Sequence, residues 1–395
     1  MVSVSDLFLL NPKSELDDNM KVGFIPMALV EDGFSGNHFY EERTWKDVKR
    51  GYCHFQNGDI GIAKISPCFE NRKSTIFKNL PNTYGAGTTE LVILRPIKVY
   101  TKFYLYLFKS DWYIKEGTKY FKGVVGQQRV HKEIFTDLHI PLPPFAEQQR
   151  IVEEIEYWFA LIDQIEQDKS DLQTAIRQTK SKILDLAIHG KLVLQNPNDE
   201  PASELLKRIN PKAEITCDNG HYPVGWIDVI LGDIFYHNTG KALNSSNKEG
   251  VLRNYLTTSN VYWNQFDLSL VKQMPFRDNE LEKCTVQKGD LLVCEGGDVG
   301  RSAIWNFDYN ICIQNHIHRL RPKGDLNVSF YYYVLRFLKE HNRIGGKGIG
   351  LLGLSSNELH KIGMPLLPRK EQDRIVLKIE ELFSVLDNIE NALEA

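Results

Sequence analysis

Two glycine-rich stretches of this sequence carry side chains whose chemistry suits a nucleic acid. The first holds Gln127, Gln128 and Arg129, and the second reads GGDVGR over residues 296–301. Glutamine can form two hydrogen bonds with adenine, and arginine can form two with guanine. Glycine allows the backbone to approach a phosphate or a base edge closely. Both stretches therefore predict contact with DNA; the alternatives are an exposed polar loop and a tight turn between strands.

Further loop residues extend this set in both halves of the chain. In the first half, the loop that begins at Lys64 corresponds to residues 296–301. In the second half, the glycine-rich stretch around Lys347 corresponds to residues 123–130. The residues expected to contact DNA are Lys64, Ser66, Arg72, Lys73, Lys122, Gln127, Gln128, Arg129, Gly296, Gly297, Asp298, Gly300, Arg301, Asn315, His316 and Lys347.

Two histidines of the second half, His316 and His318, fall on the same side of an expected strand. A zinc site needs three or four ligands, and no further ligand cluster accompanies this pair. Contact of Asn315 and His316 with DNA, or support of their loop, is the better interpretation. We therefore expect no metal and no other cofactor.

Basic residues concentrate in the same part of each half. Residues 71–132 contain twelve Lys plus Arg and three Asp plus Glu, a net charge of +9. Residues 301–370 contain eleven and four, a net charge of +7, whereas residues 147–188 contain five and nine, a net charge of −4. A solvated charged face is the alternative, but two basic regions on an acidic spacer suit contact with a polyanion at two places.

A long helix is expected to separate the two sets of loops. From Ile151 to Leu186, positions spaced alternately by four and three residues are mostly apolar. A repeat of 3.5 residues held over several heptads is typical of a coiled-coil seam, and such a seam needs a partner helix. The expected seam positions are Ile151, Ile155, Trp158, Ile162, Ile165, Leu172, Ile176, Ile183 and Leu186.

The partner helix is a second copy of the first. Residues 139–166 and 363–390 match one another at a constant offset of 224. The heads before these helices repeat more faintly, since HFQNGDI matches TVQKGDL and LVILRP matches IHRLRP. Such a pattern is typical of an internal repeat with two heads and a helical spacer. The second copy continues the seam at Ile375, Ile379, Leu382, Leu386 and Ile389.

The fold class expected from this pattern is α+β, with two mixed α/β heads separated by long helices that form an antiparallel coiled coil. Short aromatic and β-branched runs broken by Gly, Asn and Pro favour strands in the heads. The expected divisions are a first head at 1–143, a spacer helix at 144–190, a linker at 191–223, a second head at 224–367 and a last helix at 368–395.

Composition excludes several other classes of protein. The chain of 395 residues has a net charge of −3 and six cysteines without a Cys-x-x-Cys motif, which favours free thiols in a cytoplasmic setting. No apolar run of about 18 residues occurs, so no membrane span is expected. No phosphate-binding loop, nucleophile elbow or amino-methyltransferase motif occurs either, so the chain is not expected to be an enzyme.

Several stretches resemble one family in particular. PLPPFAEQQRIVEEIE, its repeat PLLPRKEQDRIVLKIE, and KGDLLVCEGGDVGRSAIW are similar to the specificity subunits of type I restriction–modification systems. The resemblance covers nearly the whole chain. It implies two target-recognition domains, each reading one half of a split double-stranded DNA sequence, and two antiparallel helices that act as a ruler. It also implies docking of methyltransferase subunits, two in number, and of restriction subunits.

The sequence departs from that family in two places. Only the second head has the lead-in Pro223-Val224-Gly225-Trp226. The last helix stops near Ala395, whereas its first copy continues to about residue 189, so the distal half of the first helix is expected to lack its partner within this chain. A coiled-coil scaffold that binds only proteins is the rival hypothesis, and salt-dependent binding to duplex DNA separates the two.

Overall fold

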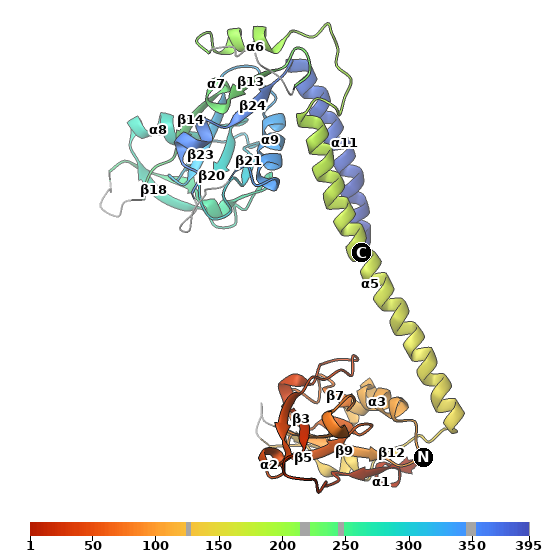
Figure 1. Ribbon diagram of the computed structural model, residues 1–395. Helices are drawn as coiled ribbons and strands as arrows, with labels where there is room; N and C mark the ends of the chain where they lie inside the picture. The colour runs from red at the N-terminus through yellow and green to blue at the C-terminus, as the bar shows by residue number, and fades with distance from the viewer. Residues whose placement is uncertain (124–127, 214–221, 244–248, 345–352, 395) are drawn as a thin grey trace. The chain divides into compact units, whose positions relative to one another are not determined.

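The chain is divided by its contacts into two units, Met1–Glu166 and Gln167–Ala395. The structure is a computed structural model that describes residues 1–123, 128–213, 222–243, 249–344 and 353–394 (Figure 1). Both units mix helices with small sheets, as the expected α+β class requires. The long helix α5 (Phe145–Ile188) crosses the division between them. No described helix is apolar over a length that would cross a membrane.

Two four-stranded sheets form the first unit. One has the order β2 (Phe8–Leu10), β9 (Leu91–Pro96), β6 (Ile60–Ala63) and β7 (Ser74–Ile76). The other has the order β4 (Glu41–Thr44), β3 (Lys21–Ile25), β8 (Tyr84–Gly87) and β5 (Cys53–Gln56), in which only β3 and β8 are parallel. The remaining elements are β1 (Val2–Ser3), α1 (Val4–Leu7), η1 (Met27–Leu29), α2 (Trp45–Val48), η2 (Pro81–Thr83), α3 (Thr101–Lys109), α4 (Asp111–Thr118), β10 (Phe121–Lys122), β11 (Arg129–Val130), η3 (Lys132–Phe135) and β12 (His139–Ile140).

The second unit repeats both sheets in the same order. One has the order β14 (Phe235–Thr239), β23 (Ile317–Pro322), β20 (Leu291–Cys294) and β21 (Ser302–Ile304). The other has the order β18 (Lys272–Phe276), β15 (Val251–Leu256), β22 (Ile311–Ile313) and β19 (Thr285–Val286), again with one parallel pair, β15 and β22. The remaining elements are α6 (Ala202–Ile209), β13 (Ile227–Ile230), α7 (Leu231–Ile234), η4 (Thr258–Asn260), β16 (Val261–Tyr262), β17 (Gln265–Phe266), α8 (Asp278–Cys284), α9 (Val328–Glu340), α10 (Ser356–His360), β24 (Gly363–Leu366) and α11 (Arg369–Glu394).

The faint repeat HFQNGDI and TVQKGDL has a structural cause. In the first unit Asp59 is 1% exposed and accepts two hydrogen bonds from Arg95, at 2.9 and 2.8 Å. In the second unit Asp290 is also 1% exposed and accepts two from Arg321, at 2.8 and 2.6 Å. The glycine before each aspartate has a positive φ, which a side chain would disfavour, so the turn and the ion pair recur together.

A buried glutamine attaches each head to its helix. Gln148 accepts the backbone N–H of Tyr100 at 2.9 Å and donates to the carbonyl of Pro143 at 2.8 Å. Gln372 does the same with Asn327 and Leu367, at 2.8 and 3.0 Å. The repeated Glu-Gln of the sequence therefore fixes where each helix begins.

The last part of α5 pairs with α11 in the second unit. Lys180 forms ion pairs with Asp387 at 2.6 Å and Glu390 at 2.8 Å. Beyond Lys180, Ile183, which is 7% exposed, belongs to the same apolar cluster as Ile375 near the start of α11. This order is antiparallel, as expected (Figure 1). The expectation that the distal half of α5 lacks a partner was wrong, because antiparallel packing brings the short α11 to that half.

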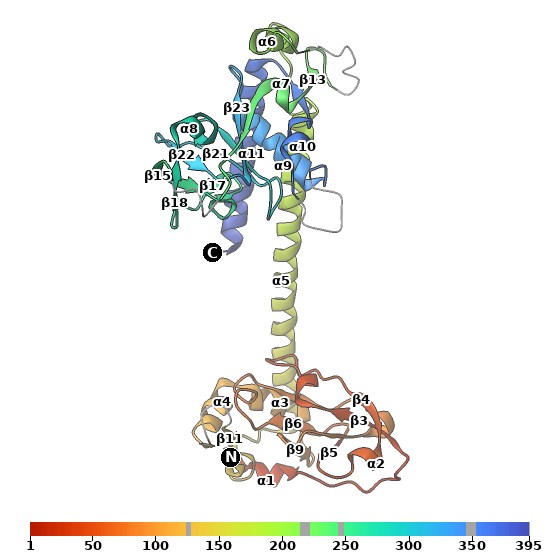
Figure 2. The same cartoon turned by 90° about the vertical axis from the view of Figure 1, so that its left-hand side faces the viewer.

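Only some of the expected seam residues are buried by other parts of the chain. Ile176, Ile183, Ile375 and Ile379 are buried, whereas Ile151, Ile155, Leu186, Leu382 and Leu386 are half-buried. Five others are exposed: Trp158, Ile162, Ile165, Leu172 and Ile389. On another side of α11, α9 packs through Tyr333 against Phe383, with ring centroids 5.9 Å apart (Figure 2).

The repeated Asp–Arg pair gives the first testable prediction. Replacing the buried Asp59 by Ala leaves the Arg95 guanidinium without its partner, and we expect a loss of about 3 kcal/mol in the free energy of unfolding. Urea unfolding of the full chain measures it. The matched control is Lys21→Ala, which breaks a pair with Glu42 whose side chains are 54% and 56% exposed and should cost less than about 1 kcal/mol. Equal costs for the two variants would contradict the structural role of Asp59.

Candidate nucleic-acid interface

A cavity of about 590 Å³ in the first unit brings expected DNA-binding residues together. Lys64, Lys122 and Arg129 line it, although they are distant in sequence. The sequence analysis missed the other basic residues of its rim, His131 and Lys132, which stand at the start of η3. The only signal for these two was the net charge of the region. Apolar side chains complete the lining, namely Leu10, Val92, Val130 and Phe135.

Backbone hydrogen bonds hold the cationic side of this cavity in place. The N–H of Val130 donates to the carbonyl of Lys64 at 2.8 Å, and the N–H of Lys64 donates to the carbonyl of Glu90 at 2.9 Å. Arg129 donates to both carboxylate oxygens of Glu90, at 2.8 to 3.2 Å. These bonds lower the pKa of the Glu90 carboxyl, so Glu90 stays charged and neutralises part of the basic rim.

Other expected residues of the first unit have partners within the protein. The backbone N–H of Ser66 donates to the carbonyl of Gln128 at 2.9 Å, so these two lie beside the cavity loop. Arg72 donates to the carbonyl of Lys109 at 2.8 Å and forms an ion pair with Asp111. Lys73 donates to the carbonyl of Val30 at 2.8 Å and pairs with Asp32 at 3.1 Å. Arg72 and Lys73 therefore join loops, and their contact with DNA stays a prediction.

Side-chain contacts hold the loop 296–301 of the second unit in place. Arg301 donates to the carbonyl of Thr258 at 2.5 Å, and its guanidinium carbon lies 5.1 Å from the centre of the Tyr262 ring. Asp298 pairs with Lys339 at 3.0 Å, and both Gly297 and Gly300 have positive φ. Arg301 thus fixes the 3-10 turn η4 in the second unit, as Lys73 fixes η1 in the first. A Cβ atom added at Gly296 would meet no described atom within 4 Å.

The remaining expected residues of the second unit lie near β23. The backbone N–H of Asn315 donates to the carbonyl of Lys241 at 3.0 Å. His316 has an exposed side chain and pairs with Glu295 at 3.2 Å. Gln127 and Lys347 lie outside the described residues. In the described ranges, no cluster of three or more His, Cys, Asp or Glu side chains suits a metal ion.

A pair of histidines in the second unit was not predicted. His318 is buried, and its Nε2 lies 2.8 Å from the carbonyl of Leu354, an oxygen that can only accept. Its Nδ1 must then accept from Nε2 of His237, at 2.9 Å. Burial lowers the pKa of His237 to about 4, with further contributions from His318 and His360, and burial also lowers the pKa of His318. Both imidazoles are therefore neutral near pH 7.

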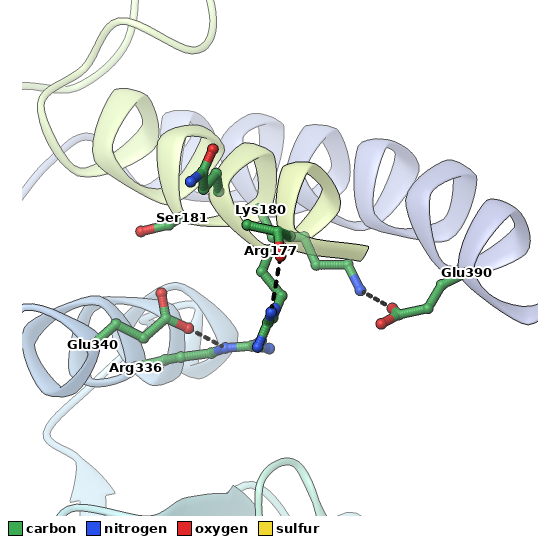
Figure 3. Close-up of a pocket in the computed structure, with 8 residues that line it drawn as sticks. Arg177, Lys180, Ser181, Arg336, Glu340 and Glu390 are labelled. Atoms are coloured by element: carbon green, nitrogen blue, oxygen red, sulfur yellow. Dashed lines mark hydrogen bonds and ion pairs between the residues drawn. The ribbon is translucent and has the colours of Figure 1, made fainter. Parts of the chain in front are cut away.

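The helices of the second unit frame another cavity, of about 620 Å³ (Figure 3). Arg177 and Lys180 line it from α5, Arg336 and Glu340 from α9, and Glu390 from α11. Arg336 pairs with Glu340 at 3.0 Å, and Lys180 with Glu390 at 2.8 Å. Two ion pairs thus line this polar groove, and Arg177 donates to the Thr174 hydroxyl at 3.2 Å.

Comparison with known proteins identifies the family. A profile of the type I restriction modification DNA specificity domain matches residues 5–174 and again residues 223–395. The chain belongs to this family of specificity subunits. The type I restriction enzyme EcoAI specificity subunit of Escherichia coli is 31% identical, over 96% of this chain and 76% of its own length. The EcoEI specificity subunit of the same species is 30% identical, over 100% and 79%.

A solved structure has the same fold. The HsdS subunit from Thermoanaerobacter tengcongensis superposes with a TM-score of 0.64 at 18% identity, over 99% of this chain and 90% of that one. The family profile and the two Escherichia coli relatives confirm the resemblance read from the sequence, and the solved structure agrees in fold. As a type I specificity subunit, the chain is a DNA-recognition subunit rather than an enzyme, and a scaffold that binds only proteins is not favoured.

The histidine pair predicts how the stability of this specificity subunit depends on pH. The pKa of His237 is depressed on folding, so the unfolded chain binds its proton first as the pH falls below about 6.5. Stability is therefore complete above that pH and decreases from there down to about pH 4. We expect a loss of roughly 1 to 2 kcal/mol from this pair by pH 4.5, because partial exposure of His237 reduces the effect.

Thermal unfolding between pH 7.5 and 4.5 measures this loss. The matched variant is His237→Leu/His318→Val, which carries the residues of the first unit, Leu10 and Val92, at these positions. Between pH 7.5 and 4.5, this variant should lose roughly 1 to 2 kcal/mol less stability than the unmodified chain. Identical pH profiles would contradict the assignment.

Proposed function

We propose that each unit of this specificity subunit reads one half of a split target in double-stranded DNA. The observation that carries the proposal is that the two units share one backbone frame but present different side chains from it. The backbone bond from Lys64 to Glu90 in the first unit, for example, recurs as the bond from Glu295 to His316 in the second. Lysine and arginine contacts to phosphates would position each unit, and loop side chains would read base edges.

The DNA-contacting residues that we propose in the first unit are centred on the cavity, with Lys64, Lys122 and Arg129. In the second unit they are Asn315 and His316, together with the loop 296–301. Because such a subunit recognises DNA, a cytoplasmic location belongs to the same proposal.

We also propose that α5 and α11 form the docking surface for methyltransferase subunits, two per chain, to which restriction subunits are added. Trp158, Ile162 and Ile165 expose apolar side chains on α5. The first part of the helix, residues 147–166, contains six acidic residues and one basic residue. An apolar stripe with acidic flanks suits a partner helix with an apolar stripe and basic flanks. The length of α5 would set the distance between the half-sites.

Exchange of one unit tests the reading of half-sites. Residues 224–367 are replaced by the corresponding segment of a relative with a different target, and the hybrid is expressed with its methyltransferase subunits. Sequencing of methylated DNA should show one half of the target changed and the other half and the gap retained. The reciprocal exchange of residues 1–143 is the control and should change the opposite half. If both halves changed after one exchange, independent reading by each unit would be wrong.

Substitutions on α5 test the docking surface. Ile162 and Ile165 are 47% and 59% exposed, so Ile162→Asp/Ile165→Asp should alter the free energy of unfolding by less than about 1 kcal/mol but abolish co-purification of methyltransferase. The contrasting variant is Ile183→Asp, at a position 7% exposed, which should lose several kcal/mol of stability. Normal assembly of the first variant would refute this surface.

A further inference from the structure

The cavity of the first unit exists because β2 ends early. Asn11 follows β2 with a φ of +46°, and it clamps Ile93 through a backbone N–H bond of 2.7 Å and a side-chain bond of 2.9 Å. The pairing of β2 with β9 therefore stops at Leu10 and Leu94. In the second unit, β14 continues for two more residues and pairs Thr239 with His318. The last two pairs of β14 with β23, at Asn238 and Thr239, therefore have no counterpart beside the cavity of the first unit.

Backbone hydrogen bonds beside the cavity recur in the second unit, so the residues that they join can be matched. The hydrogen bond from Val130 to Lys64, at 2.8 Å, corresponds to the bond from Leu354 to Glu295, at 2.9 Å. The bond from Lys64 to Glu90 corresponds to that from Glu295 to His316, both at 2.9 Å. Lys132, two residues after Val130, begins η3, and Ser356, two residues after Leu354, begins α10. Lys132 and Ser356 therefore stand at matched positions.

The matched positions differ most in charge. Where the first unit has Lys64 and Lys132, the second has Glu295 and Ser356. The fold therefore does not require these two lysines. Within the described part of the chain, Lys64, Lys122 and Lys132 form no ion pair, whereas Glu90 beside them is paired with Arg129.

Three lysines without acidic partners around an open cavity are suited to a polyanion. Lysine acts on phosphate as a point charge with three donors, and it needs no fixed orientation to do so. The floor of Leu10 and Val92 offers apolar contact to the carbon atoms of a sugar. Bases in a duplex are recessed between the strands, whereas phosphates and sugars project outward and can enter a concave site.

We propose that this cavity binds neighbouring phosphates of one DNA strand through Lys64, Lys122 and Lys132. The inference rests on the proposed function of the two units. It assigns to these three lysines a salt-dependent, sequence-independent part of the attraction of the first unit to DNA.

The test uses the full chain and a duplex that carries its split target. The variant Lys64→Glu/Lys132→Ser gives the first unit the residues that the second unit has, so it should keep its fold. Affinity is measured by fluorescence anisotropy from about 0.05 to 0.3 M salt. Each lost lysine–phosphate contact should lower the slope of log affinity against log salt concentration by about 0.9, so we expect a decrease of about 2. Lys78→Gln, an exposed lysine of the same unit outside the cavity lining, should leave the slope unchanged.

Backbone substitution in the DNA locates the contact. Neutral methylphosphonate linkages are placed in turn along the half-site of the first unit, which the exchange of units identifies. They should weaken binding of the unmodified chain at two or three neighbouring positions and have no effect there on the double variant. Lys64→Gln/Lys132→Gln, with neutral side chains, replaces the double variant if that one melts at a lower temperature.

The outcomes separate the inference from the function on which it rests. An unchanged salt slope in a folded variant that still binds DNA overturns the phosphate site alone. Competition by inorganic phosphate at millimolar concentration, with no effect of the methylphosphonates, would make the cavity a site for free anions and would also overturn it. Absence of any binding to duplex DNA by the unmodified chain and by its complex with methyltransferase would overturn the proposed function itself.

Discussion

The structure depends on one buried amide in each unit. Gln148 and Gln372 are at most 1% exposed, and each joins the start of a helix to two backbone segments of the preceding head. A buried amide whose partners are both backbone groups is costly to displace, since each freed group would remain without a partner. The clamp therefore fixes the direction in which the helix leaves the head. In the second unit, the packing of α9 on α11 adds to this contact in positioning the head on its helix.

Much of this architecture could be predicted from the sequence because it is repeated there. The heptad spacing of α5, the second copy in α11, and the Gly-Asp turns at Asp59 and Asp290 are local patterns, and local patterns survive in a sequence. The family followed from the same stretches. What the sequence could not give is the direction in which long side chains point. Lys73 and Arg301, for which contact with DNA stays a prediction, each donate to a backbone carbonyl of a 3-10 turn or its end.

Contacts between residues far apart in the chain were also hidden. His237 and His318 are separated by 80 residues, and their hydrogen bond arises only when β14 pairs with β23. The cavity near Lys64 depends on the left-handed conformation of Asn11, a residue with no obvious role in the sequence. Periodicity reports which face of an element is buried, but not where a strand pairing stops. The prediction that the distal half of α5 is unpaired was wrong for a related reason. The direction in which the two helices pack decides which half of α5 is paired, and periodicity does not report that direction.

The ion pairs of Lys180 have a consequence for how the two helices align. A seam with a heptad repeat fits almost as well after a slip of seven residues, so apolar packing alone leaves several alignments close in energy. Lys180 meets Asp387 and Glu390, which are one turn apart on α11, in a single alignment. A slip of seven residues would bring Glu380 and Phe383, or Glu394 alone, opposite Lys180, so one of its two ion pairs would be lost. Lys180 thus favours one register of the coiled coil. That register also decides at which residue of α5 the unpaired part begins.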